Sequence, residues 1–382
     1  MSLRVEEQMI LGQPGDPLQV HHLVLRGSDR AIGHHLAEMA QARYAAAALP
    51  SAEPLRVRVQ REWTRRGYPA LFERLRGVAE AFGVDLGDDA CDLAALAAVP
   101  GVGAAGGGIV FLPPRTTVGH RPVVSRSADA VPCDRGVPPL CRPYLLELHP
   151  EDGHASIAIV AWDLLGAVEG VNAEGLCIAV TVDEEARCER GFEPAIGPVA
   201  GLDELRTVRY VLDGCANALE AREKLLSVKR YWAAAPAHFL VADRHGDAFA
   251  FEPGASVSRD HLLDAAGLPL VLSNHAASRY PTDAALPRED GPGATFARLR
   301  RLRAALAETP APYGTAEIRA IARAGFAEAV PWPGEAGIRT LWHSEYDLRE
   351  RAVQVSFWVG DAAEPGGEPR AVRSEYLRLE LR

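Results

Sequence analysis

Two short polar segments follow strongly apolar runs and contain residue types that amide chemistry uses. Asp129 ends the segment Arg-Ser-Ala-Asp, directly after the run PVVS, and Asn274 and His275 follow the run PLVL in the same way. An asparagine amide can donate a hydrogen bond to a developing oxyanion, and a carboxylate can orient an amine or act as a base. The structural alternatives are a turn-forming Asp129 and an Asx turn at Asn274.

The other motifs do not predict chemistry. Residues 101–106 match the GxGxxG spacing of a dinucleotide-binding motif. In that motif a helix must follow the glycines, and Pro113 and Pro114 exclude such a helix here. We expect the glycines up to Gly108 to allow close backbone approach instead. The histidine pairs at 21–22 and 34–35 cannot each chelate one ion, because adjacent side chains diverge on a strand or a helix. No HExxH or GxSxG is present, and the six cysteines form no CxxC pair. We therefore expect neither a cofactor nor a metal.

The hydrophobic pattern changes along the chain. Residues 18–26 alternate as a strand, Asp29 can cap a helix, and a second helical pattern runs to Gly83. From about residue 109, short β-rich runs dominate, interrupted by helical patterns over 202–228 and 294–308. This order predicts an α+β fold, with two stacked antiparallel sheets and helices outside, in one domain over 1–382.

Composition limits the class of partner. The chain has 41 basic and 51 acidic residues, a net charge of −10, which argues against nucleic-acid binding. No stretch reaches the roughly 18 apolar residues that span a bilayer, and the start lacks the pattern of a signal peptide. We expect a cytoplasmic protein with a small-molecule substrate, no nucleic acid and no membrane; the oligomeric state stays open.

Several motifs, in order along the chain, resemble one family. They are Arg26-Gly27-Ser28 with Ile32-Gly33, Val123 to Asp129, Gly170-Val171-Asn172-Ala173-Glu174-Gly175-Leu176, Asn217 to Ala221, Val241-Ala242-Asp243 with Glu252, Ser273-Asn274-His275, and Thr295 with Arg298-Leu299. Together they are similar to the penicillin acyltransferase-like, autoproteolytic branch of the Ntn hydrolases, which includes isopenicillin-N acyltransferase and N-β-alanyl-amine hydrolases.

The resemblance implies a four-layer αββα sandwich and a precursor that cleaves itself before a cysteine nucleophile. Counting back from Asp129 places that cysteine among residues 108–111, and aligning Phe111 with the family's aromatic residue puts Gly108 at the nucleophile. A glycine cannot attack a carbonyl, so we expect no self-cleavage. Residues 1–107 then correspond to a pro-segment that is not released, and residues 108–382 to the core sandwich.

The resemblance also implies which residues remain in the site. We expect Asp129, Asn274 and His275 to be catalytic. We expect a pocket of about 300–1,000 Å³ whose substrate-binding residues are Gly108, Ile109, Arg126, Asn172 and Arg298. The first hypothesis is an enzyme of specialised metabolism that performs non-covalent acid–base chemistry, such as cyclisation or condensation. The alternatives are a non-catalytic binding or scaffold protein, and an amide hydrolase or acyltransferase with an unexpected nucleophile, for which Cys91 and Cys133 are candidates.

Overall fold

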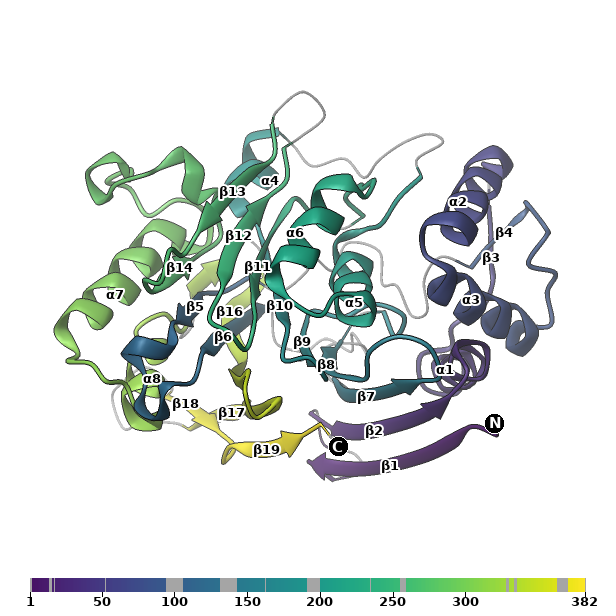
Figure 1. The fold of residues 1–382 in the computed structure, drawn as a ribbon, viewed down its shortest axis with the longest axis horizontal. Coiled ribbons are helices and arrows are strands. Elements are labelled where there is room, and N and C mark those ends of the chain that lie inside the picture. The colour runs from purple at the N-terminus through teal and green to yellow at the C-terminus, as the bar shows by residue number, and fades with distance from the viewer. Residues whose placement is uncertain are drawn as a thin grey trace.

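The structure is a computed structural model (Figure 1). It describes residues 2–13, 16, 18–51, 53–93, 106–130, 143–161, 163–190, 200–233, 235–254, 259–327, 330–332, 335–362 and 370–381. Cys133, Cys141 and most of the GxGxxG segment, residues 101–105, lie outside the described residues.

In the described part of the chain, nine strands form the first sheet. Their spatial order is β1 (Arg4–Leu11), β2 (Val20–Gly27), β7 (Tyr144–Pro150), β8 (Ser156–Val160), β9 (Glu169–Asn172), β10 (Cys177–Val182), β11 (Ala237–Ala242), β12 (Ala248–Glu252) and β13 (His261–Asp264). Every pair is antiparallel except β2 and β7, which run parallel. The parallel pair arises because β1 and β2 form a hairpin whose second strand joins β7 at the edge of the otherwise antiparallel sheet.

The second sheet contains eight strands in the residues that the structure describes. Six follow the order β14 (Leu270–Leu272), β5 (Ile109–Leu112), β6 (Val123–Ala130), β16 (Glu335–Asp347), β17 (Ala352–Ala362) and β18 (Arg370–Arg373), while β15 (Val330–Trp332) pairs with β16 and β19 (Leu377–Glu380) with β17. A separate short pair is formed by β3 (Leu49–Pro50) and β4 (Cys91–Asp92).

The two sheets pack face to face through their buried inner side chains. Glu169 of the first sheet accepts hydrogen bonds from Trp342 Nε1 at 2.6 Å and from Ser344 Oγ at 2.9 Å, both in the second sheet. Helices α5 (Glu204–Gly214) and α6 (Ala218–Ser227) pack on the outside of the first sheet, and α7 (Thr295–Glu308) and α8 (Thr315–Arg323) on the second (Figure 1). The predicted α+β sandwich with helices outside is therefore confirmed.

The N-terminal segment is built into this sandwich. It supplies β1 and β2 to the first sheet and then α1 (Asp29–Tyr44), α2 (Pro54–Gly67) and α3 (Pro69–Phe82), which gather beside the sheets (Figure 1). The buried Arg74 of α3 joins Asp29 Oδ1 at 2.8 Å and Asp213 Oδ2 of α5 at 2.6 Å. Residues 1–93 are thus held by a strand pair and a buried ion network, while the boundary at 107/108 stays a prediction.

Local sequence signals account for most helix boundaries. The first helix is capped by Ser28, whose Oγ accepts from Ala31 N, and not by Asp29 as expected, because Asp29 turns to Arg74. The pattern that ends at Gly83 is divided between α2 and α3, because Pro69 lacks the N–H needed to continue a helix. The pattern over 202–228 likewise divides, and Asn217 caps the second helix by accepting from Glu220 N.

Candidate functional site

The predicted nucleophile position lies at the start of β5, where the backbone runs very close to β6. Gly108 O accepts from Ser127 N at 2.9 Å, and Gly106 exchanges two backbone bonds of 3.0 Å with Asp129. Gly107 has φ 130°, and a Cβ built on it would lie 1.8 Å from Ser127 O. The expectation of close backbone approach is met here, since only glycine fits between the strands at this point.

Hydrogen bonds hold the peptide that joins Gly107 to Gly108. Thr181 Oγ1 donates to Gly107 O at 3.3 Å, and Gly108 N donates to Ser127 Oγ at 2.9 Å. Gly107 N donates to Asn274 Oδ1 at 3.0 Å. A Cβ built on Gly108 would lie 2.7 Å from Leu302 Cδ1, so that leucine fills the volume of the missing side chain.

Arg298 brings together Asp129 and Asn274, two of the three predicted catalytic residues. Its Nη2 donates to Asp129 Oδ2, its Nη1 to Asn274 Oδ1, and its Nε to Gly325 O at 2.9 Å. Thr340 Oγ1 donates to the other Asp129 oxygen at 2.6 Å. Both carboxylate oxygens of Asp129 are therefore engaged by the protein, and the whole group is buried.

The Asn274 amide uses all of its hydrogen-bonding capacity inside the protein. Its oxygen accepts from Gly107 and Arg298, and its Nδ2 donates to Thr181 Oγ1 at 3.1 Å and to Val182 O at 3.0 Å. An amide offers two donors and two acceptor positions. A developing oxyanion could receive a bond from Asn274 only by displacing Thr181 or Val182, so its catalytic role stays a prediction that these contacts do not favour.

His275 differs from its neighbours, because one ring nitrogen has no partner. Ser273 Oγ donates to Thr295 O at 3.1 Å, so the Thr295 hydroxyl must be the donor in its 3.1 Å bond with Ser273 Oγ. The Thr295 proton is then committed, and the 2.8 Å contact with His275 Nδ1 requires that nitrogen to carry the hydrogen. Among the residues that the structure describes, no group bonds to His275 Nε2, which is left as a bare, buried acceptor.

The surroundings keep the His275 imidazole neutral. Burial lowers the pKa of His275 to about 4, and a positive charge on His238 acts in the same direction. Asp183 opposes this effect, and its carboxylate lies 3.0 Å from His238 Nε2. The pKa of Asp183 is lowered by His238 against the opposing effect of burial. Asp183 and His238 belong to no recognisable motif, so the sequence does not predict them as site residues.

The remaining predicted binding residues lie deeper in the fold. Arg126 lies between the sheets, 3.5 Å from Glu169 and donating to Val180 O at 2.9 Å, and Ile109 is fully buried on the neighbouring strand. Asn172 donates to Leu212 O and Cys215 O and accepts from two backbone amides of its own turn. A ligand would have to displace one of these bonds, so the binding role of Asn172 stays a prediction that its contacts do not favour.

Other candidate chemistry is limited in the described residues. No group of three or more His, Cys, Asp or Glu side chains among them could hold a metal ion, and no helix there is long and apolar enough to cross a bilayer. The proposed substitute nucleophile Cys91 lies in β4, outside the Arg298 network, where burial and Asp88 raise the pKa of its thiol. A raised thiol pKa disfavours the reactive thiolate.

No protein-family model and no curated protein matches this sequence. Among solved structures, penicillin V acylase from Agrobacterium tumefaciens has 17% identity and a TM-score of 0.46, over 65% of this chain and 82% of that one. A variant of conjugated bile acid hydrolase from Clostridium perfringens has 12% identity and a TM-score of 0.46, over 72% and 97%. A Caenorhabditis elegans ortholog of N-acylethanolamine-hydrolyzing acid amidase has 10% identity and a TM-score of 0.34, over 63% and 92%. These TM-scores are below 0.5, so the likenesses assign neither a family nor an activity to this chain.

Proposed function

We propose that this protein is an uncleaved, nucleophile-free relative of the Ntn hydrolases that transfers protons on a small metabolite without a covalent intermediate. The bare, buried Nε2 of His275 carries this proposal. In the proposed step, Nε2 accepts a proton from a C–H or O–H group of the substrate, and the imidazolium returns it to the product. The substrate's bonds rearrange between these two transfers, as in a cyclisation or condensation.

The environment of His275 holds the imidazole in one orientation and in its base form. Its Nδ1–H is fixed by Thr295, so the lone pair of Nε2 has one direction. A pKa of about 4 keeps the imidazole in its base form at neutral pH. The rings of Phe296 and Tyr280 flank it at 4.7 and 5.5 Å between centroids, giving an apolar surround in which a substrate donor would not compete with water.

The contacts at Gly108 support the loss of acyl transfer. No thiol or hydroxyl is present at that position, and Leu302 occupies the side-chain volume. Asp129 and Asn274 are joined by Arg298, so in this proposal they maintain the site and do not react. Because the polar groups of Asp129 and Asn274 are fully hydrogen-bonded within the protein, a second candidate function is a binding protein that performs no chemistry.

Two measurements test the loss of acyl transfer. Intact-mass spectrometry should give one chain of 41.0 kDa. Incubation with penicillin V and with conjugated bile acids, the substrates named for two of the structural neighbours, should release no product. Two fragments that divide between Gly107 and Gly108, or hydrolysis of either amide, would contradict the proposal.

Proton transfer itself can be followed without knowing the product. A panel of small keto acids, ketones, esters and amides is incubated with the protein in D₂O, and deuterium uptake is read by mass spectrometry. We expect catalysed exchange in at least one compound, reduced about 10²–10⁴-fold in His275→Gln, the usual contribution of a general base. His34→Gln, on the exposed face of α1, is the matched control and should retain the full rate. Binding of panel compounds without exchange would favour the non-catalytic alternative.

A further inference from the structure

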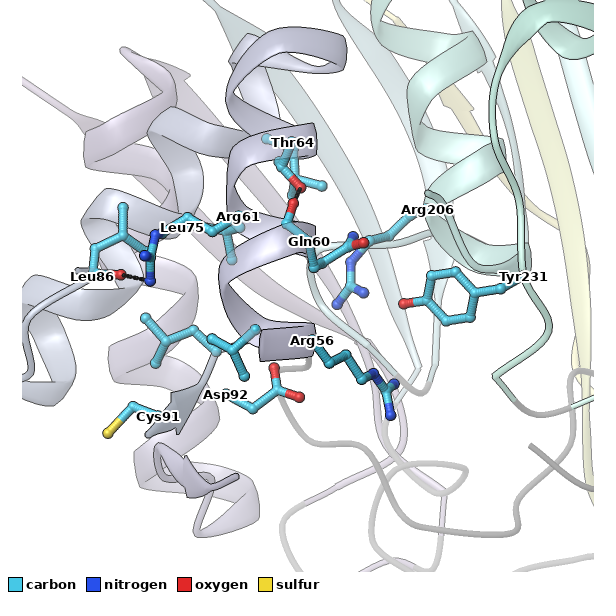
Figure 2. A pocket seen from close by; sticks show the side chains of 13 residues that line it. Arg56, Gln60, Arg61, Thr64, Leu75, Leu86, Cys91, Asp92, Arg206 and Tyr231 are labelled. Atoms are coloured by element: carbon cyan, nitrogen blue, oxygen red, sulfur yellow. Dashed lines mark hydrogen bonds between the residues drawn. The ribbon is translucent and has the colours of Figure 1, made fainter. Parts of the chain in front are cut away.

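A cavity of about 50 Å³ lies where the N-terminal helices meet the sandwich, and its lining shares no residue with the surroundings of His275 and Arg298. Its polar lining comes from α2, β4, α5 and the segment after α6, and Figure 2 shows these side chains facing one another across it. Its polar lining includes Arg56, Gln60, Arg61, Asp92, Arg206 and Tyr231. None of them belongs to the His275 or Arg298 surroundings.

Two of these polar side chains, Gln60 and Arg61, already make hydrogen bonds within the protein. Gln60 donates to Gly201 O at 2.7 Å and accepts from Gly201 N at 3.0 Å. Arg61 joins Asp89 Oδ1 at 2.7 Å and Leu86 O at 3.0 Å. These contacts fix the walls of the cavity and direct the Arg61 guanidinium to Asp89 and Leu86, so neither side chain is available to a ligand.

Arg206 is likewise engaged within the protein. Its Nη1 lies 2.6 Å from Asp203 Oδ2 and its Nη2 lies 2.9 Å from Asp163 Oδ2, and all three groups are buried. The cavity therefore borders a buried cluster in which one guanidinium faces two carboxylates, so this cluster offers no free positive charge to a ligand. Any charge recognition must come from the other members of the lining.

Arg56 and Tyr231 remain as donors without acceptors. In the part of the chain that the structure describes, neither makes a side-chain hydrogen bond or an ion pair. The Arg56 guanidinium is permanently charged. Burial and the charge of Asp203 raise the pKa of Tyr231, so its hydroxyl keeps its proton and can donate. In Figure 2 this hydroxyl points across the pocket toward α2, the helix that carries Arg56.

We propose that this cavity binds a short aliphatic monocarboxylate, with Arg56 and Tyr231 donating to the carboxylate. The guanidinium fork matches carboxylate geometry, which makes arginine suited to such a ligand. The rest of the lining is apolar and would contact the ligand's tail; it includes Val57, Leu71, Leu75, Leu86 and Leu93. This second site is independent of the function proposed above.

Size and charge restrict the ligand further. At roughly 10–15 Å³ for one water-sized group, a cavity of 50 Å³ holds about three to five non-hydrogen atoms, the size of acetate or propanoate. Malonate has seven non-hydrogen atoms and exceeds this volume, and the wall of the cavity also carries Asp92. The site should therefore prefer propanoate to malonate.

Isothermal titration calorimetry of the full chain with sodium propanoate, acetate, malonate and propylammonium chloride tests this proposal. We expect propanoate to bind with millimolar affinity, malonate at least tenfold more weakly, and propylammonium not at all. Arg56→Gln and Tyr231→Phe should each weaken propanoate binding at least tenfold. Arg66→Gln, an exposed arginine on the same helix, is the control and should leave the affinity unchanged.

A steric variant gives a second, charge-neutral test. Val57→Phe projects a larger side chain into the cavity from α2 and should abolish propanoate binding while circular dichroism stays the same. His275→Gln should leave propanoate affinity unaltered, which separates this site from the proposed proton-transfer site. Unchanged affinity in both Arg56→Gln and Val57→Phe, no binding of propanoate to the wild-type chain, or binding of propylammonium instead would overturn the proposal.

Discussion

Leu302 of α7 and Gly108, the residue before β5, share one small volume between sheet and helix. A Cβ built on Gly108 would lie 2.7 Å from Leu302 Cδ1, closer than two carbon atoms approach in folded proteins. Gly108, the position that the resemblance aligns with the nucleophile, therefore leaves no empty space. Leu302 fills this volume, so a larger residue at position 108 would require the Leu302 side chain to move.

This relationship predicts the outcome of a double-mutant cycle. Gly108→Ala should destabilise the protein by about 1–3 kcal/mol through overpacking, and Leu302→Ala by about 2–5 kcal/mol through cavity formation. In the double variant the new methyl group enters the space left by Leu302. The double variant should therefore lose less stability than the sum of the two single losses, by at least about 0.5 kcal/mol. Urea denaturation measures all three. Strict additivity would show that the two residues do not share a volume.

The fold was accessible from the sequence because its signals are local and repeated. Short apolar runs such as 109–112, 237–242 and 270–272 became strands β5, β11 and β14, and the run from Thr295 became α7. The polar segments at two strand ends lie together in the fold, since Asp129 and Asn274 both contact Arg298, while their catalytic role stays a prediction.

What the sequence could not supply depends on contacts between distant residues. The saturation of Asn274 arises from Thr181, Val182 and Gly107, which lie 92 or more positions away in the chain. Hydrogen bonds through the Thr295 hydroxyl determine which nitrogen of His275 carries the hydrogen, and the spacing of residues in the sequence does not predict them. The N-terminal strand β1 was also missed, because its exposed, highly charged sequence lacks the alternation of a half-buried strand.

The Arg298 bridge should be important for stability. Arg298→Met removes the cation that pairs with the buried Asp129 and should cost about 3–5 kcal/mol, because an uncompensated buried charge remains. Asp129→Asn in the same chain removes that charge and should recover part of the loss. Arg301→Met, on the exposed side of the same helix, loses one bond to Ala324 O and should cost only about 0.5–1.5 kcal/mol. Equal effects of the two arginine variants in urea denaturation would argue against the bridge.

His275 should make the protein sensitive to acid. Its pKa is about 4 in the folded chain and near its usual 6.5 when unfolded, so the unfolded chain binds the extra proton between these values. Stability from this residue is complete above pH 6.5 and is lost as pH falls toward 4. At about 1.4 kcal/mol per unit, the full loss is about 3 kcal/mol.

The measurement compares wild type and His275→Gln by urea denaturation between pH 7.5 and pH 4. The wild-type protein should lose about 3 kcal/mol more over this range than the variant. The buried His343, whose pKa is also lowered by burial, is present in both proteins and cancels in the difference. Identical acid profiles would mean that His275 is not held neutral in the folded state, and the proposed base would lose its support.

Two glycines determine how the N-terminal helices attach to each other. A Cβ built on Gly33 of α1 would lie 2.0 Å from Arg74 O of α3, and one on Gly77 would lie 2.0 Å from Arg30 O. The clashing atoms belong to the backbone, so no side-chain rotation relieves them. The same helix contact positions Arg74 between Asp29 and Asp213, which ties α1 and α3 to α5.

Gly33→Ala should therefore cost about 3 kcal/mol or more, although alanine favours helix by about 1 kcal/mol over glycine. Separating the helices also moves Arg74 from its carboxylates and leaves buried charges poorly paired. Gly67→Ala is the matched control: its Cβ would meet only the Trp63 side chain, at 3.3 Å, so its effect should stay within about 1 kcal/mol. Urea denaturation gives both values, and limited proteolysis should cut Gly33→Ala first within residues 1–93. A Gly33→Ala chain as stable as wild type would show that α1 and α3 do not pack at this distance.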